Sequence, residues 1–105
     1  MKASMDLRDG KMTVFLKGEL DHSSAQEIMR FIERRIECHL PRTLVLDMAG
    51  VSFMDSSGIA VILKADKRQK ETGGRFWVEN ILPQPMKVLS AAKIERIVKI
   101  SVLSE

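Results

Sequence analysis

Thr-Leu-Val-Leu-Asp-Met, at residues 43–48, is the short stretch that decides the fold. Its residues favour extended structure, and only Asp47 interrupts the apolar run that follows Thr43. A run of this length and character is typical of a strand that is buried on both faces of a sheet. We therefore expect residues 43–48 to form the central strand.

A helix is predicted on the N-terminal side of this strand. From residue 24 to about residue 38, apolar residues recur at intervals of three and four, and charged residues occupy the other faces. Pro41 prevents the helix from continuing. Two capping boxes fit its start, namely Ser23 with Gln26, or Ser24 with Glu27.

A second helix is predicted on the C-terminal side, after a loop at residues 49–55. Residues 56–71 are apolar in their first half and charged in their second half, and Gly73-Gly74 supplies the stop signal. We expect the first half of this helix to be buried and the second half to face solvent.

The N-terminal residues predict a β-hairpin. Residues 2–8 alternate in polarity, and Asp9-Gly10 is a strong turn signal before a second strand at residues 11–17, which Gly18 ends. The second strand carries apolar residues on both of its faces, with Phe15 opposite Leu16. This pattern indicates that the strand is covered on both sides.

The C-terminal third continues the alternation of strands and helices. Residues 75–79 alternate as a strand, Pro83 and Pro85 open a short helix, and residues 97–100 form a last strand or an extended tail. Strands separated by helices favour right-handed crossovers and a parallel sheet. The sequence therefore predicts an α/β fold with a mixed, mostly parallel sheet, an N-terminal β-hairpin and about three helices, in a single domain over residues 1–105.

Composition excludes several classes of protein. A chain of 105 residues that is 45% hydrophobic can bury a core without metals or disulfides. Cys38 is its only cysteine, so no internal disulfide and no zinc-site spacing is present, and a reducing, cytoplasmic setting is expected. No apolar run approaches the ~18 residues of a membrane span, so we expect neither secretion nor a membrane anchor. No cofactor is expected.

The net charge of +3 is locally concentrated in the basic residues of 64–75. Direct nucleic-acid binding is disfavoured, because this run contains no aromatic residue and the chain has no recognised nucleic-acid motif. Trp77 is expected to provide packing area and not a stacking platform. The basic run is interpreted as a solvated helix face or as a landing surface for an acidic protein partner.

The candidate functional segment is residues 51–59, Val-Ser-Phe-Met-Asp-Ser-Ser-Gly-Ile, between a strand and a helix start. A serine at such a position can cap the free N–H groups of the first turn, which is a sufficient structural explanation. The same position also suits a phosphate, since those N–H groups and the helix dipole favour an anion. A phosphoserine there would place nearly two negative charges on the surface that a partner contacts.

These residues resemble those of a known family. Residues 53–59, Phe-Met-Asp-Ser-Ser-Gly-Ile, look like the phosphorylation loop of the anti-sigma factor antagonists, which share the STAS fold. Residues 18–22, Gly-Glu-Leu-Asp-His, are similar to the loop before the first helix of that family and suggest its sporulation branch. The resemblance covers almost the whole chain.

The resemblance implies a binding switch and no enzymatic activity. The unmodified protein would bind an anti-sigma factor that is also a serine kinase, phosphorylation would release it, and a PP2C-type phosphatase would restore it. Six residues would form the site: Ser56 as the phosphoacceptor, with Asp21, His22, Asp55, Ser57 and Gly58 as partner-binding and loop residues. Asp21 and His22 also fit a turn before a helix.

Three other functions are compatible with parts of the sequence. Ser56, His22 and Asp21 or Asp55 could suggest a hydrolase, but the first glycine of a strained serine elbow is absent. Nucleotide binding has no glycine-rich phosphate loop in its support. A STAS scaffold, or a transporter-associated regulatory module without a phosphorylation switch, is the main alternative, and the intact Asp55-Ser56-Ser57 argues against it.

Overall fold

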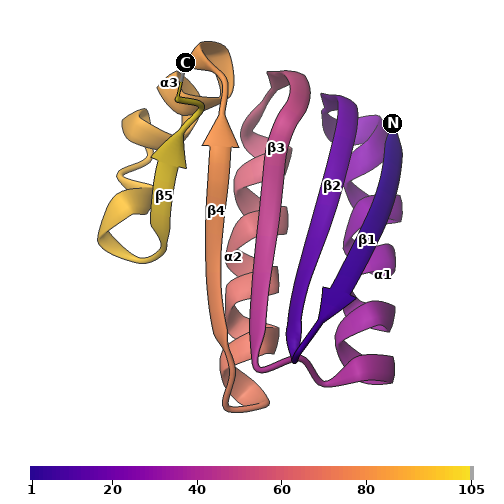
Figure 1. Cartoon of the computed structure of the whole chain (residues 1–105). Helices are drawn as coiled ribbons and strands as arrows, with labels where there is room; N and C mark the ends of the chain where they lie inside the picture. The colour runs from indigo at the N-terminus through magenta and orange to yellow at the C-terminus, as the bar shows by residue number, and fades with distance from the viewer. Residues whose placement is uncertain (105) are drawn as a thin grey trace.

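A computed structural model describes residues 1–104, in which strands alternate with helices (Figure 1). In chain order the elements are β1 (Lys2–Arg8), β2 (Lys11–Leu20), α1 (His22–His39), β3 (Thr43–Met54), α2 (Ser56–Glu71), β4 (Arg75–Ile81), α3 (Pro83–Ala91), a 3-10 helix (Ile94–Arg96) and β5 (Lys99–Val102). The predicted order of strands and helices is confirmed, with the 3-10 turn before β5 as an addition.

The strands form one five-stranded sheet in the order β1-β2-β3-β4-β5. β1 and β2 form the antiparallel hairpin, and β2, β3, β4 and β5 pair in parallel. The prediction of a mixed, mostly parallel sheet is thereby confirmed. β3 lies in the middle of the sheet, as its nearly continuous apolar sequence indicated.

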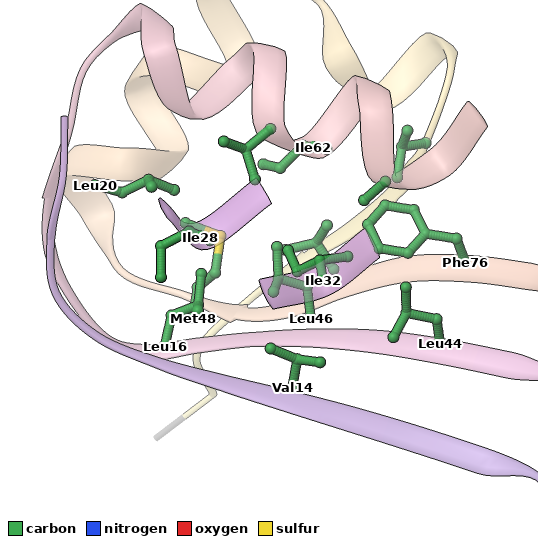
Figure 2. Close-up of a cluster of buried hydrophobic side chains, with 14 of the residues drawn as sticks. Val14, Leu16, Leu20, Ile28, Ile32, Leu44, Leu46, Met48, Ile62 and Phe76 are labelled. Atoms are coloured by element: carbon green, nitrogen blue, oxygen red, sulfur yellow. The ribbon is translucent and has the colours of Figure 1, made fainter. Parts of the chain in front are cut away.

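The hydrophobic core lies between one face of the sheet and the helices. Helices α1 and α2 lie behind the strands in Figure 1, and residues of α3 and the 3-10 helix join the same buried cluster. Figure 2 shows side chains from strands and helices meeting in this layer, including Val14, Leu16, Leu20, Ile28, Ile32, Leu44, Leu46, Met48, Ile62 and Phe76. In the described part of the chain, no helix is both long and apolar enough to cross a membrane.

The other face of the sheet is open, so the prediction that β2 is covered on both sides is wrong. No helix lies in front of β1 to β4 in Figure 1, and Phe15 on that face is 43% exposed. The helices place their apolar side chains on the core face only. Val45 on the open face is nevertheless fully buried. It pairs with Thr13 of β2 on one side and with Trp77 of β4 on the other.

Strands β2 and β3 extend furthest beyond their predicted ends, and β4 also runs two residues further than predicted, to Ile81. Gly18 does not end β2, and the expected loop at residues 49–55 is mostly strand, because β2 and β3 stay paired up to Leu20 and Met54. The pairing register between β2 and β3 shifts on both sides of Gly18, which has φ of +121°. At Gly50 a Cβ atom would lie 2.7 Å from the Leu16 carbonyl oxygen, so this glycine permits close approach of the backbones.

The second half of α2 is less exposed than predicted, because two of its polar residues are buried. The Asp66 carboxylate pairs with Lys70 at 2.9 Å, which partly compensates its burial. Gln69 is fully buried, and its Nε2 donates a hydrogen bond to the Pro41 carbonyl at 2.7 Å. These two residues extend the buried stripe of the helix to its last turn.

Candidate functional site

The two sequence segments that carry the candidate site lie side by side at one edge of the sheet. Because β2 and β3 are parallel neighbours, Leu20 pairs with Met54, and both strands end at the same edge. The Asp55 N–H donates to the Leu20 carbonyl at 3.2 Å. Helices α1 and α2 each begin within two residues of these strand ends, so their N-termini are adjacent.

Asp21 is the N-cap of α1, which corrects the predicted start of that helix. Its Oδ1 accepts hydrogen bonds from the N–H groups of Ser23 at 3.0 Å and Ser24 at 3.2 Å. The Ser24 hydroxyl accepts from the Asp21 N–H at 3.1 Å and completes a capping box. The predicted boxes, Ser23 with Gln26 and Ser24 with Glu27, are wrong because β2 runs to Leu20 and the helix follows at once.

The hydrogen bonds at Asp21 also affect its ionisation. The Ser23 hydroxyl, which donates to Oδ1 at 2.7 Å, is the largest cause of a pKa lowered below the usual aspartate value. The N–H groups of Ser24 and Ser23 lower the pKa further, and partial desolvation opposes them. Asp21 therefore stays negatively charged beside the site.

Asp55 connects the N-termini of the two helices. As the N-cap of α2, it accepts a hydrogen bond from the Ser57 N–H at 2.8 Å through Oδ1. Its Oδ2 accepts from the His22 N–H at 3.3 Å, so one carboxylate bridges the first turns of α2 and α1. This contact fixes the positions of the two loop segments relative to each other.

Ser56 and Ser57 differ in their surroundings. Ser56 is the first residue of α2 and is exposed, whereas Ser57 is partly buried. Ser57 lines a surface groove of about 530 Å³ between α1 and α2, together with His22 from α1. The rest of the groove mixes apolar and charged side chains, namely Ala25, Gln26, Met29, Arg30, Glu33, Ala60, Val61 and Lys64.

Gly58 packs the first turn of α2 against the end of β3. A Cβ atom at this position would collide with Cγ and Sδ of Met54 and would lie 3.1 Å from Cδ2 of Leu20. Both neighbours are fully buried, so neither can move aside without disturbing the core. The absence of a side chain at Gly58 therefore sets how closely the helix start approaches the sheet.

Replacing Gly58 with alanine is expected to destabilise the protein. Overpacking a buried site costs about 1–3 kcal/mol, and a collision with Met54 belongs in the upper part of that range. This exceeds the gain of about 1 kcal/mol in helix propensity. Urea unfolding measures the difference. In a Met54→Ala background the same change should become neutral or stabilising, and an equal cost in both backgrounds would contradict this account.

Gln84 is a structural contributor to the site that sequence reasoning missed. Its Oε1 accepts from the Met54 N–H at 2.8 Å, and its Nε2 donates to the Met54 carbonyl at 3.0 Å. The Gln84 side chain thus makes the two hydrogen bonds to the Met54 backbone that a neighbouring strand would otherwise make. No local pattern could reveal this contact, because thirty positions separate the two residues.

The site can accept an anion but has no catalytic arrangement for hydrolysis. Neither α1 nor α2 carries an acidic residue in its first turn, so a negative group at Ser56 would meet the positive end of the α2 dipole. Among residues 1–104, the Asp21 and Asp55 carboxylates accept hydrogen bonds from backbone N–H groups and serine hydroxyls and from no histidine ring. Within the same residues, no group of three His, Cys, Asp or Glu side chains could hold a metal ion.

Comparison with a family model and with curated proteins finds relatives over nearly the whole chain. A family model described as the STAS domain matches residues 2–102. An anti-sigma F factor antagonist from Paenibacillus polymyxa is 29% identical over 100 residues, which cover 95% of this chain and 86% of that protein.

Solved structures share the fold. An anti-sigma factor antagonist from Mycobacterium paratuberculosis has a TM-score of 0.86 at 20% identity, over 95% of this chain and 84% of that one. The Bacillus cell fate determinant SpoIIAA, in its phosphorylated form, has a TM-score of 0.72 at 24% identity, over 94% of this chain and 90% of that one. At these identities the likeness concerns the fold alone.

Proposed function

The chain belongs to the STAS domain family, and from that premise we propose that it is an anti-sigma factor antagonist of the sporulation type, switched off by phosphorylation of Ser56. Antagonists of this family are regulatory binding proteins, and the chain is not an enzyme. In its unmodified form it binds an anti-sigma factor that is also a serine kinase, and this binding frees the sigma factor. The relative from Paenibacillus polymyxa carries the name of such an antagonist.

The observation that carries this proposal is the position of Ser56. It is exposed at the first residue of α2, directly after the Asp55 cap and beside the start of α1. A hydroxyl in this place is accessible to a kinase, and the first turn of the helix tolerates the phosphate that results. Ser57 and Gly58, which follow it, hold the helix start in place.

The release step follows from charge. The partner-facing surface consists of the exposed ends of the two loops, with Asp21 and His22 from one and Asp55 from the other. A phosphate at Ser56 adds nearly two negative charges next to the carboxylates of Asp21 and Asp55. A partner packed over this surface would have to desolvate them and would be repelled wherever it is itself acidic. The phosphorylated protein is therefore released.

Two enzymes act on this switch in the proposal. The anti-sigma factor serine kinase places the phosphate, and a PP2C-type phosphatase removes it, so the chain is the substrate of both. The setting is the cytoplasm, where the single cysteine stays reduced. The chain itself contacts neither nucleic acid nor a membrane in this function.

One mixture tests the proposal. The protein is combined with its cognate anti-sigma kinase, once with ADP and once with ATP, and intact mass and complex formation are followed together. We expect a stable complex with ADP, and with ATP a mass increase of one phosphate followed by dissociation. A complex without any phosphate transfer would support the scaffold or transporter-associated alternative instead, and no complex in either condition would reject the antagonist function.

A further inference from the structure

The open face of the sheet, formed by the outward residues of β1 to β5, is unusual for a fold of this kind. Parallel sheets are almost always covered on both faces, because their connections place helices on each side. Here β2 to β5 are parallel, yet α1 and α2 lie on one side only, and no helix lies in front of β1 to β4 (Figure 1). The open face therefore lacks the layer that such sheets normally carry.

The centre of the open face offers apolar area. Phe15 of β2 is 43% exposed, and Trp77 of β4 is partly exposed. Across the sheet, Trp77 pairs with the buried Val45 of β3, which in turn pairs with Thr13 of β2. Phe15 also lines a shallow hollow between β1 and β2, together with Lys2, Ala3, Ser4, Leu16 and Lys17. A partner that covers Phe15 and Trp77 must itself present an elongated apolar stripe.

Unpaired positive charge surrounds this apolar centre. The Nζ atoms of Lys11 and Lys99 each lie 5.8 Å from the centroid of the Trp77 ring. By strand register, six cations belong to the open face, namely Lys2, Arg8, Lys11, Lys17, Arg75 and Lys99. Within residues 1–104, Arg8 alone of these six forms an ion pair, with Asp6 at 3.2 Å.

Three carboxylates of the open face are already engaged, whereas Glu19, which pairs with Phe53 at the far end of β2, is exposed and forms no ion pair within residues 1–104. Asp6 pairs with Arg8, and Asp47 accepts hydrogen bonds from the Asn80 amide at 2.8 Å and the Ala49 N–H at 2.9 Å. Glu79 accepts from the Trp77 indole N–H at 3.2 Å. The face thus presents cations without internal partners, and their chemical complement is a row of carboxylates.

We propose that the open face is a docking surface for an acidic amphipathic helix of a partner protein. The apolar stripe of that helix covers Phe15 and Trp77, and its glutamates or aspartates pair with Lys11 and Lys99. Residues 11–17 of β2 extend about 20 Å, which is the length of about thirteen helical residues. This surface lies on the other side of the sheet from the groove between α1 and α2, so its occupation does not depend on the proposed switch at Ser56.

A helix fits these observations better than a nucleic acid or a lipid surface. Binding of single-stranded nucleic acid uses aromatic rings on which successive bases stack. Here Trp77 is only partly exposed, has the ammonium groups of Lys11 and Lys99 near its ring, and pairs in a different row from Phe15. Anionic membranes remain a distinct outcome of the experiment below.

Trp77 is the only tryptophan of the chain, so its fluorescence reports directly on the open face. The full chain is titrated with a synthetic helical peptide that carries leucines along one stripe and glutamates on both sides. A peptide of the same composition in shuffled order is the control for net charge. Oligothymidylate and phosphatidylglycerol vesicles are titrated in parallel. Affinity is taken from the midpoint of each titration.

We expect saturable binding of the helical peptide, and a loss of at least about tenfold in affinity for the double variant Lys11→Glu, Lys99→Glu. The matched double variant Arg34→Glu, Lys87→Glu makes the same charge change at exposed positions on α1 and α3 and should bind like the wild type. Ser56→Asp should also leave this affinity unchanged. If the first variant does not fold by circular dichroism, Lys11→Gln with Lys99→Gln takes its place.

Four results would overturn the proposal. They are no saturable signal with the helical peptide, equal binding of the shuffled peptide, equal weakening by the matched double variant, and saturation by oligothymidylate or vesicles only. The last of these would assign the open face to a nucleic acid or a membrane instead.

Discussion

Replacing Ser56 with alanine is expected to abolish phosphate incorporation by the cognate kinase, whereas replacing Ser57 with alanine is expected to leave it in place. A kinase must enclose the hydroxyl that it modifies. Ser56 is exposed at the first residue of α2, and Ser57 is partly buried and lines the groove between α1 and α2. One step along a helix turns a side chain by roughly 100°, so the two hydroxyls point to different surroundings.

The comparison needs a control for surface serines in general. Ser52, which is exposed on β3 four positions earlier, provides it as Ser52→Ala. Each variant is checked for folding by circular dichroism and then incubated with kinase and ATP, and phosphate is counted by intact mass. Incorporation that persists in Ser56→Ala but disappears in Ser57→Ala would move the switch by one residue. It would leave the membership of the STAS family untouched.

The fold was predictable where local sequence patterns determine it. The central position of residues 43–48 follows from their apolar run, and the predicted start of α2 at Ser56 is confirmed, although its N-cap is Asp55 and not a serine. Periodicity likewise identified the buried face of α1. These are the places where local preference and tertiary packing agree.

The remaining errors arise from contacts between distant residues. Gly18 and Gly50 look like strand breakers, but pairing of β2 with β3 continues past them, and their missing side chains permit the irregular register. Because β2 extends to Leu20, Asp21 becomes the N-cap of α1 and the helix begins at His22. The Gln84 contact with Met54 and the open face of the sheet depend on the three-dimensional arrangement, which no short window of sequence contains.

Ser56→Asp is expected to weaken binding of the anti-sigma partner by at least about tenfold, and Ser56→Ala is expected to retain it. The aspartate places one negative charge beside the carboxylates of Asp21 and Asp55, at the surface that the partner covers. It carries less charge than a phosphate, so the loss should be smaller than that caused by phosphorylation. Alanine removes the acceptor without adding charge, and its complex should persist in ATP.

This prediction separates an effect on binding from an effect on folding. An acidic residue in the first turn of α2 is favoured by the helix dipole, so Ser56→Asp should unfold at the same temperature as the wild type or slightly above it. Ser90→Asp, at an exposed position of α3, supplies the same charge change outside the site and should bind the kinase normally. Affinities are measured in ADP, where no phosphate can be transferred. If Ser56→Asp binds as tightly as the wild type while remaining folded, charge at this position does not control release. The phosphate would then have to act through its size or its contacts with the first turn of α2.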